Sequence, residues 1–445
     1  MEQLTGNKNR AELLKLASGS FIMKITGIFV SLLFAYIVAN FFGAGAWGEF
    51  SLAFSYLIFG SILGSAGLDF SLLKLTAGIG KKDLKSISFV YKKAMLVTIL
   101  VSSAISLLFY LQSGWIAETL FGISDLTTSF QIASLGILPV AITYLNTNTL
   151  QGLKKITLFA FLQYVSKNLF GILFLVPFLW ALGDHPQIVL ISFLSGLVVI
   201  AIFSQLFIYR EGISFWKKMK DGNQAQKYEK ILLKIAVPLL LTGVLLFLKN
   251  WIDTIMVGVF MQEADVGVYT IALKIAGLLN IFFVSIGNIM APKISEMYEK
   301  GLSAELEHLV QYSTKLSVWL TLPFLLILLL FSDFILSIFG PDFIAGKYTL
   351  MILAAGFYLN IAAGPVGHFL NMTESQAAYR NFTFLIVIIG IGLNYLLIPL
   401  FGLEGAAAAN LISLFMWNGF CINYVRKKYK MRTYYLPFRF KEKLF

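Results

Sequence analysis

The stretch VLLFLKNWIDTIMVG (Val244–Gly258) combines an apolar run, typical of a membrane-spanning helix, with two charged residues near its middle, Lys249 and Asp253. A charge at the centre of a bilayer costs roughly 2.5–3.5 kcal/mol on insertion scales. Charged residues in such positions are rare and usually functional. The stretch therefore predicts a membrane helix, and it indicates that the two charged residues inside the helix have a role.

The surrounding composition is that of a polytopic membrane protein. Hydrophobic residues make up 58% of the 445 residues and charged residues 13%, about half the charged share of a soluble protein. The net charge of +12 lies in short connections between apolar runs, so it indicates membrane topology rather than binding to nucleic acid. One cysteine, Cys421, and three scattered histidines predict neither a disulfide within the chain nor a metal site.

Twelve apolar segments are each long enough to cross a bilayer, which takes about 20 mostly apolar residues. The predicted spans are 18–42, 47–73, 88–112, 127–150, 156–182, 187–209, 235–260, 265–291, 310–332, 346–370, 377–400 and 403–425. Lysine and arginine gather in alternate connections, and acidic residues such as Glu118 and Asp333 lie in the others, with Lys347 as the exception. Because this bias sets orientation, we expect both termini in the cytoplasm.

The two halves of the chain repeat one pattern. The shift that places Leu13 over Leu232 also places Trp47 over Val266 and Lys74 over Lys293. Six spans in each half predict a parallel repeat, a known transporter plan with its substrate site at the repeat interface. We therefore predict an N-terminal six-helix bundle at 1–212, a cytoplasmic linker at 213–230, a C-terminal six-helix bundle at 231–425 and a basic cytoplasmic tail at 426–445.

Polar residues recur at helical spacing on the first two predicted helices of each half. These stripes comprise Ser20, Lys24, Gly27, Ser31 and Ala35; Ser51, Ser55, Ser65 and Asp69; Thr242, Lys249 and Asp253; and Thr270, Lys274 and Gly277. Matching stripes on equivalent helices predict one water-filled cleft between the halves. Lys24, Lys249 and Lys274, with Lys167 adding to them, exceed Asp253 in charge, so the cleft would attract an anion.

Purely structural explanations of these polar residues compete with the anion-binding cleft. Lys249 and Asp253 lie one helical turn apart and would neutralise each other, and such a pair could serve only to join helices. Lys24 lies near a helix end and could extend to the membrane surface, and the serine and glycine stripes could serve close helix packing. Trp251 could stack on a sugar ring or pack in the core.

Three stretches carry a family likeness: FFGAGAWGEFSLAFSYL (Phe41–Leu57), NWIDTIMVGVFMQEADVGVYTIALKI (Asn250–Ile275) and LEGAAAANLIS (Leu403–Ser413). They resemble the polysaccharide transporter family, the Wzx-type O-antigen flippases of the multidrug/oligosaccharidyl-lipid/polysaccharide (MOP) exporter superfamily. The middle stretch is the most specific, and the resemblance follows nearly the whole chain in span order. It implies an all-α fold of twelve transmembrane helices in two six-helix bundles, arranged as a V-shaped MOP-type transporter.

The resemblance implies a transporter rather than an enzyme. Its substrate would be an undecaprenyl-pyrophosphate-linked oligosaccharide, moved by alternating access from the cytoplasmic to the outer leaflet of the bacterial plasma (inner) membrane for O-antigen, capsule or exopolysaccharide assembly. Partners would be membrane lipids, a polysaccharide polymerase and chain-length machinery. Lys24 and Lys274 lie on helices that carry cations in related flippases.

The energy source is expected to be a gradient. No Walker lysine loop occurs in the sequence, and no cofactor is expected. Coupling to H⁺, Na⁺ or the membrane potential remains open, since moving one charge is worth about 2.3 kcal/mol per 100 mV.

Two other functions compete with the flippase. A multidrug and toxin extrusion cation antiporter of the same superfamily would need acidic groups in its cavity. The predicted cavity offers only Asp253 and Asp69 as acidic groups, and it contains several lysines. A membrane polysaccharide polymerase or ligase would carry a large external loop, whereas the loops predicted here are short.

Overall fold

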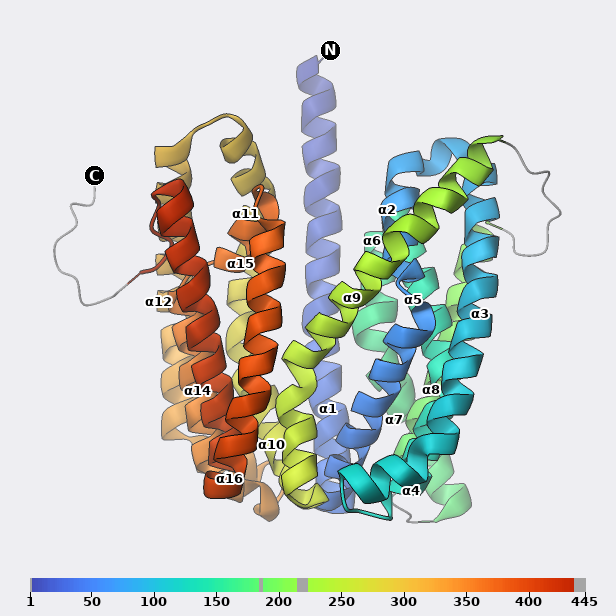
Figure 1. Ribbon diagram of the computed structural model, residues 1–445, viewed down its shortest axis with the longest axis vertical. Helices are drawn as coiled ribbons and strands as arrows, with labels where there is room; N and C mark the ends of the chain where they lie inside the picture. The colour runs from blue at the N-terminus through green and yellow to red at the C-terminus, as the bar shows by residue number, and fades with distance from the viewer. Residues whose placement is uncertain (1, 184–186, 214–222, 436–445) are drawn as a thin grey trace. The chain divides into compact units, whose positions relative to one another are not determined.

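The computed structural model describes residues 2–183, 187–213 and 223–435, and every element in these ranges is helical (Figure 1). The chain divides into a first unit, Met1–Phe42 with Glu49–Val244, and a second unit, Gly43–Gly48 with Leu245–Phe445. The predicted domain boundaries stay a prediction. Residues 214–222 of the linker and 436–445 of the tail lie outside the described residues.

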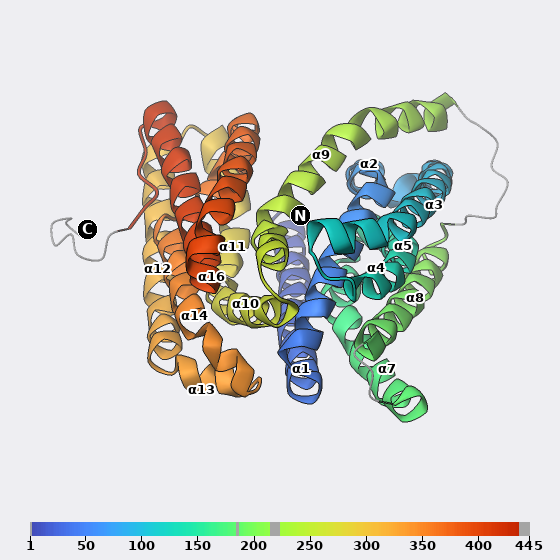
Figure 2. The ribbon, with the colours of Figure 1, turned by 60° about the horizontal axis from the view of Figure 1, so that its bottom comes forward.

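The first unit holds most of α1, the helices up to α8 and the beginning of α9 (Asn223–Phe260). Its elements are α1 (Glu2–Ser65), α2 (Leu68–Ile79), η1 (Gly80–Asp83), α3 (Leu84–Trp115), the π-helix η2 (Ile116–Leu120), α4 (Leu126–Leu135), α5 (Ile137–Gly152), α6 (Ile156–Ala160), the π-helix η3 (Phe161–Val165), α7 (Ser166–Leu182) and α8 (Gln187–Arg210). α7 and α8 lie side by side (Figures 1 and 2). Phe34 and Phe50 of α1 pack their rings against Phe193 of α8, so edge-to-face and tilted aromatic contacts form part of this core.

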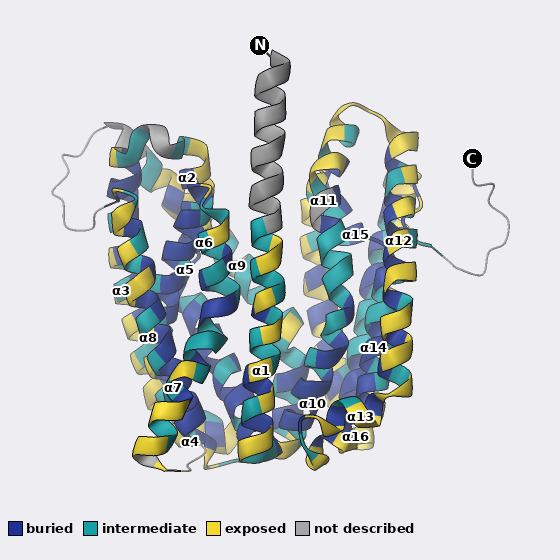
Figure 3. Cartoon of the chain, turned by 180° about the vertical axis from the view of Figure 1, so that it is seen from behind, coloured by how far each residue is buried: buried dark blue, intermediate teal, exposed yellow. Residues whose placement is uncertain are grey.

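The second unit holds the rest of α9 and all later elements. These are α10 (Glu263–Ala276), η4 (Gly277–Leu279), α11 (Asn280–Glu299), α12 (Ser303–Leu330), α13 (Ser332–Ser337), η5 (Pro341–Gly346), α14 (Lys347–Ala362), α15 (Val366–Met372) and α16 (Gln376–Tyr429). Ile294, Phe369 and Trp417 lie in its core. Exposed positions follow the outer side of α12 (Figure 3) and include Trp319 and Phe324, as expected for a surface that faces lipid.

Two helices are far longer than a bilayer requires. α1 has 64 residues and α16 has 54, whereas about 20 residues span the hydrocarbon core. Each contains one glycine outside the helical region, Gly43 with φ 83° and Gly402 with φ 59°. A positive φ suits glycine because it lacks a Cβ. In α16 the chain reverses at Gly402, so that a first arm (376–401) and a second arm (403–429) run side by side (Figure 1).

The prediction of an all-helical, polytopic membrane protein is confirmed for the described residues. Nine of their helices are long and apolar enough to cross a membrane, or ten when α4 and α5, bent by 41°, form one broken span. The count of twelve spans stays a prediction. It holds if the parts of α1 before and after Gly43 cross the bilayer separately and the two arms of α16 do so as well.

Three predicted spans were wrong in being drawn as continuous. Span 127–150 bends by 41° between α4 and α5. Span 47–73 breaks where Ala66 and Gly67 both adopt positive φ, between α1 and α2. Span 346–370 breaks between α14 and α15, where Gly364 has φ 85° and precedes Pro365, which has no N–H to continue a helix. Hydropathy alone does not reveal such breaks, because the residues on both sides remain apolar.

Candidate functional site

A buried carboxylate forms the centre of the candidate site in the second unit. Asp253 of α9 is only 7% exposed. One carboxylate oxygen accepts a hydrogen bond of 2.7 Å from the Asn394 amide on the first arm of α16, and the other accepts one of 2.6 Å from the Asn410 amide on the second arm. Three helical segments therefore meet at this side chain, and its charge is stabilised by neutral donors.

The predicted ion pair between Lys249 and Asp253 was wrong. No such pair occurs in the described residues; the Lys249 ammonium lies 4.1 Å from the centre of the Trp417 ring instead. One helical turn does place the two residues on one face, and both line the same small cavity. The pair is absent because two amides already bind the carboxylate and the indole face attracts the ammonium.

Several polar atoms beside Asp253 have no partner. The Oδ1 atoms of Asn394 and Asn410 and the Ser413 hydroxyl are buried without a hydrogen bond in the described structure. Buried polar groups are normally paired. The adjoining cavity of about 40 Å³, lined by Asp253, Asn410 and Ser413, is large enough for a water or a small ion. Rotating either amide by 180° would turn its Oδ1 toward the carboxylate.

These atoms suit a hard monovalent cation or a proton better than a transition metal. Carboxylate and carbonyl oxygens are the ligands that hard cations prefer. Among the described residues, no three His, Cys, Asp or Glu side chains are grouped so as to hold a metal ion.

The other predicted residues of the second unit lie elsewhere. The Lys274 ammonium is 5.3 Å from the centre of the Trp47 ring. Thr270 donates its hydroxyl to carbonyl oxygens of its own helix, the nearer being Val266 at 2.8 Å. Trp251 stacks on Phe247 with ring centres 6.2 Å apart, which favours core packing over sugar binding.

The predicted residues of the first unit form two groups. Lys24 and Lys167 lie over the rings of Tyr164 and Tyr144, at 5.8 and 5.0 Å from the ring centres. Asp69 accepts hydrogen bonds from Ser65 at 3.2 Å and Asn148 at 3.0 Å.

The predicted serines make more local contacts. Ser55 is buried and donates its hydroxyl to the Leu52 carbonyl, and Ser31 is partly buried on α1. A single cleft that joins the residues of both units stays a prediction.

Three residues of this site, Asn394, Asn410 and Trp417, are not among those predicted from the sequence. Both asparagines sit in runs of apolar and small residues, IGIGLNYLLIP and AAAANLIS. An isolated amide inside a membrane segment is costly unless it is bonded, and that signal would have identified them.

Comparison with known proteins gives the family. The sequence profile described as polysaccharide biosynthesis protein matches residues 13–298, and the MatE profile matches residues 238–396. A probable low-salt glycan biosynthesis flippase, Agl15 of Haloferax volcanii, is 28% identical over 168 residues, which are 38% of this chain and 36% of Agl15. The capsular polysaccharide biosynthesis protein CapF of Staphylococcus aureus is 23% identical over 257 residues, which are 57% of this chain and 64% of CapF.

A solved structure shows the same fold. The lipid II flippase MurJ in an inward closed conformation matches with a TM-score of 0.74 at 15% identity, over 93% of this chain and 87% of MurJ. Both curated relatives are matched over less than two thirds of their length. Since the first profile spans well over half of the residues, the chain belongs to the polysaccharide biosynthesis protein family.

Proposed function

We propose that this chain is a flippase that moves a lipid-linked glycan across a membrane. The observation that carries the proposal is the environment of three partly buried lysines, Lys24, Lys167 and Lys249. In the described part of the chain each ammonium lies over an aromatic ring, and none has a hydrogen bond or ion pair. An aromatic face holds a cation without neutralising it, so these lysines remain able to attract an anion.

The substrate we propose is an undecaprenyl-pyrophosphate-linked oligosaccharide, moved from the cytoplasmic to the outer leaflet of the plasma membrane. Lysine binds phosphate as a point charge, and a pyrophosphate carries more than one negative charge. The names of Agl15 and CapF, which refer to a glycan flippase and to capsular polysaccharide, support this class of substrate. A polymerase and chain-length machinery are proposed partners on the same grounds.

We propose that the Asp253 site binds the coupling cation, Na⁺ or H⁺. The two oxygens of its carboxylate and the unpaired amide oxygens of Asn394 and Asn410 supply up to four oxygen ligands. Lys249 lines the same cavity. A cation bound at Asp253 would raise the positive potential around Lys249, and this would couple cation binding to binding of the anionic headgroup.

Transport by lysine variants tests the proposal. Purified protein in proteoliposomes would be given a fluorescent polyprenyl-pyrophosphate-linked oligosaccharide, and the fraction reaching the other leaflet measured. We expect Lys24→Ala, Lys167→Ala and Lys249→Ala each to slow flipping by about tenfold or more, because a hydrogen bond to a charged group contributes about 1.5–3 kcal/mol. The control is Lys300→Ala, which removes an exposed lysine paired with Glu296. Normal flipping by all three variants would remove them from the mechanism.

A multidrug cation antiporter is the second candidate. The MatE profile match over residues 238–396 favours it, as do the buried carboxylates Asp69 and Asp253. It predicts that a lipophilic cation is exported in exchange for Na⁺ or H⁺ and that the lysine variants transport it as well as the wild type. The same proteoliposomes, loaded with an organic cation dye, separate the two functions.

A further inference from the structure

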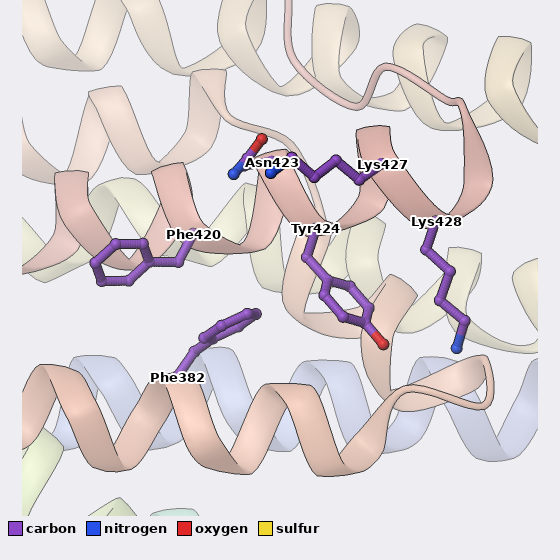
Figure 4. Close-up of a pocket in the computed structure, with 6 residues that line it drawn as sticks. All are labelled: Phe382, Phe420, Asn423, Tyr424, Lys427 and Lys428. Atoms are coloured by element: carbon purple, nitrogen blue, oxygen red, sulfur yellow. The ribbon is translucent and has the colours of Figure 1, made fainter.

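A pocket with an aromatic wall and a basic rim lies at one end of the seam between the two arms of α16. It has a volume of about 530 Å³ and is lined by Phe382 of the first arm and by Phe420, Asn423, Tyr424, Lys427 and Lys428 of the second. Figure 4 shows Phe420 and Tyr424 reaching from the second arm toward Phe382. This volume is within the usual range of about 300–1,000 Å³ for sites that bind small molecules.

The wall of the pocket consists of aromatic side chains that pack against one another. The Phe382 ring lies 6.0 Å from the Phe420 ring and 5.8 Å from the Tyr424 ring, centre to centre, and the latter pair is edge-to-face. All three side chains are only partly buried. They therefore offer apolar surface to a hydrocarbon chain that enters between the arms.

The rim is basic, and its two lysines differ. The Lys428 ammonium donates to the Ser375 hydroxyl at 3.0 Å and to the Glu374 carbonyl at 3.3 Å, which ties it to the beginning of the first arm. Lys427 is exposed and has no hydrogen bond or ion pair in the described residues. Figure 4 shows the Lys428 side chain reaching toward the first arm and the Lys427 side chain running back along the second arm beside Asn423. One anchored cation thus faces the gap between the arms, and a second cation adds charge to its rim.

We propose that this pocket binds one anionic phospholipid from the leaflet at that end of α16. Its phosphate would contact Lys428, with Lys427 adding positive charge to the rim, and its acyl chain would lie against Phe382, Phe420 and Tyr424. Aromatic residues and lysines at the end of a membrane-crossing helix are the side chains that meet lipid headgroups. The charge of the rim selects an anionic headgroup over a zwitterionic one, and the aromatic wall selects a lipid over free phosphate.

This lipid site is distinct from the proposed transport site. Lys249, Asp253 and Asn410 line a different cavity farther along the same two arms. A phospholipid bound in the pocket would hold the arms together at one end and so stabilise the second unit. The inference does not depend on the flippase proposal, because bulk phospholipid is present whatever the chain transports.

Native mass spectrometry of the full chain, titrated with phosphatidylglycerol, tests the proposal. The pocket variant is Lys427→Gln with Lys428→Gln. The matched control is Arg426→Gln with Lys430→Gln, which removes the same charge from exposed neighbours that do not line the pocket. A lysine near an anionic lipid contributes about fivefold to binding, so we expect the pocket variant to bind the first phosphatidylglycerol roughly thirtyfold more weakly. The control should change by less than about twofold.

Four results would overturn the proposal. The first three are equal binding of phosphatidylcholine with the same acyl chains, equal weakening in the control variant, and displacement of phosphatidylglycerol by inorganic phosphate at equal concentration. One-for-one displacement by a smaller amount of undecaprenyl phosphate would also overturn it and assign the pocket to the polyprenyl carrier. A measurement without any variant completes the test: phosphatidylglycerol should raise the melting temperature of the wild-type protein more than phosphatidylcholine does.

Discussion

Asp253 shows how a single buried charge can be kept in a membrane protein without a counter-ion. Two amides from the two arms of α16 bind its oxygens, and each amide could instead present its own oxygen after a 180° rotation. Asparagine in place of Asp253 could therefore still bond to both neighbours, while it would lack the charge that attracts a cation.

We expect Asp253→Asn to fold nearly as stably as the wild type but to lose any dependence of flipping on Na⁺ or pH. Asp253→Ala should lose the same dependence and also be destabilised by about 2–5 kcal/mol, because it leaves two buried amide donors unpaired. Melting temperature and transport under imposed cation gradients would be measured together. A cation dependence retained by Asp253→Asn would place the coupling site elsewhere.

Two glycines in the second unit permit a reciprocal contact between repeated sequences. A Cβ on Gly48 would lie 1.7 Å from the Glu263 carbonyl oxygen, and one on Gly267 would lie 2.1 Å from that of Ala44. The shift that places Leu13 over Leu232 also places Ala44 over Glu263 and Gly48 over Gly267. Equivalent positions of the repeated sequence therefore pair with each other in this contact.

We expect Gly48→Ala and Gly267→Ala each to lower the free energy of unfolding by about 1–3 kcal/mol or more, because backbone atoms cannot yield as a side chain would. Gly45→Ala is the control, since its Cβ would meet no atom within 4 Å. Thermal unfolding in detergent measures the effect. Equal melting temperatures for all three variants would contradict the close contact.

At the scale of elements, the start of α3 gives a prediction about pH. Asp83 is its N-cap, and hydrogen bonds from the Ser86 hydroxyl and backbone N–H hold the pKa of this carboxyl below its usual value of 3.8. A lowered pKa contributes stability above the unfolded-state pKa, and this contribution is lost as the pH falls through the folded-state pKa. Asp83→Ala should cost about 1 kcal/mol at neutral pH, and less below pH 4. Asp83→Asn, also a good cap, should be stable at neutral pH without this acid sensitivity. Melting curves between pH 3 and 7 for the wild type and both variants would measure this difference in acid sensitivity.

The end of the described chain stabilises the break between α14 and α15. Tyr435 donates its backbone N–H to the Ala362 carbonyl at 3.0 Å, and the Thr433 hydroxyl donates to the Ala363 carbonyl at 3.2 Å. The Thr433 carbonyl in turn accepts from Thr314 of α12 at 2.9 Å. Residues 430–435 thus bind carbonyls that the broken helix leaves without partners.

We expect truncation after Lys430 to destabilise the second unit by about 2–4 kcal/mol, since each hydrogen bond contributes about 0.5–1.5 kcal/mol. Truncation after Tyr435 is the matched control, because it keeps all of these bonds. Proteolysis that begins in α14 or α15 would report the loss. Identical melting of both truncated proteins would show that the segment does not support the break.

The sequence predicted helix positions better than helix interruptions. Spans 187–209 and 88–112 lie within α8 and α3, because length and hydropathy alone define a membrane helix. The breaks at Gly67 and Gly364 depend on local backbone geometry that hydropathy does not record. At the site, Lys249 and Asp253 were found from their cost in hydrocarbon, whereas Asn394 and Asn410 become partners of Asp253 only when the chain reverses at Gly402.

At the scale of the whole molecule, the proposed direction of transport makes a prediction about the membrane potential. An anionic headgroup that leaves a negative interior moves down the field, and each net charge is worth about 2.3 kcal/mol per 100 mV. The ratio of substrate between leaflets at steady state should therefore rise about fiftyfold per net outward charge when 100 mV is imposed. Proteoliposomes with a potassium gradient and valinomycin would measure this ratio.

If a cation bound at Asp253 returns inward with each cycle, it adds its own charge to the movement, and Asp253→Asn should show a smaller dependence on potential than the wild type. A ratio that stays constant when the potential is collapsed would exclude the field as a driving force.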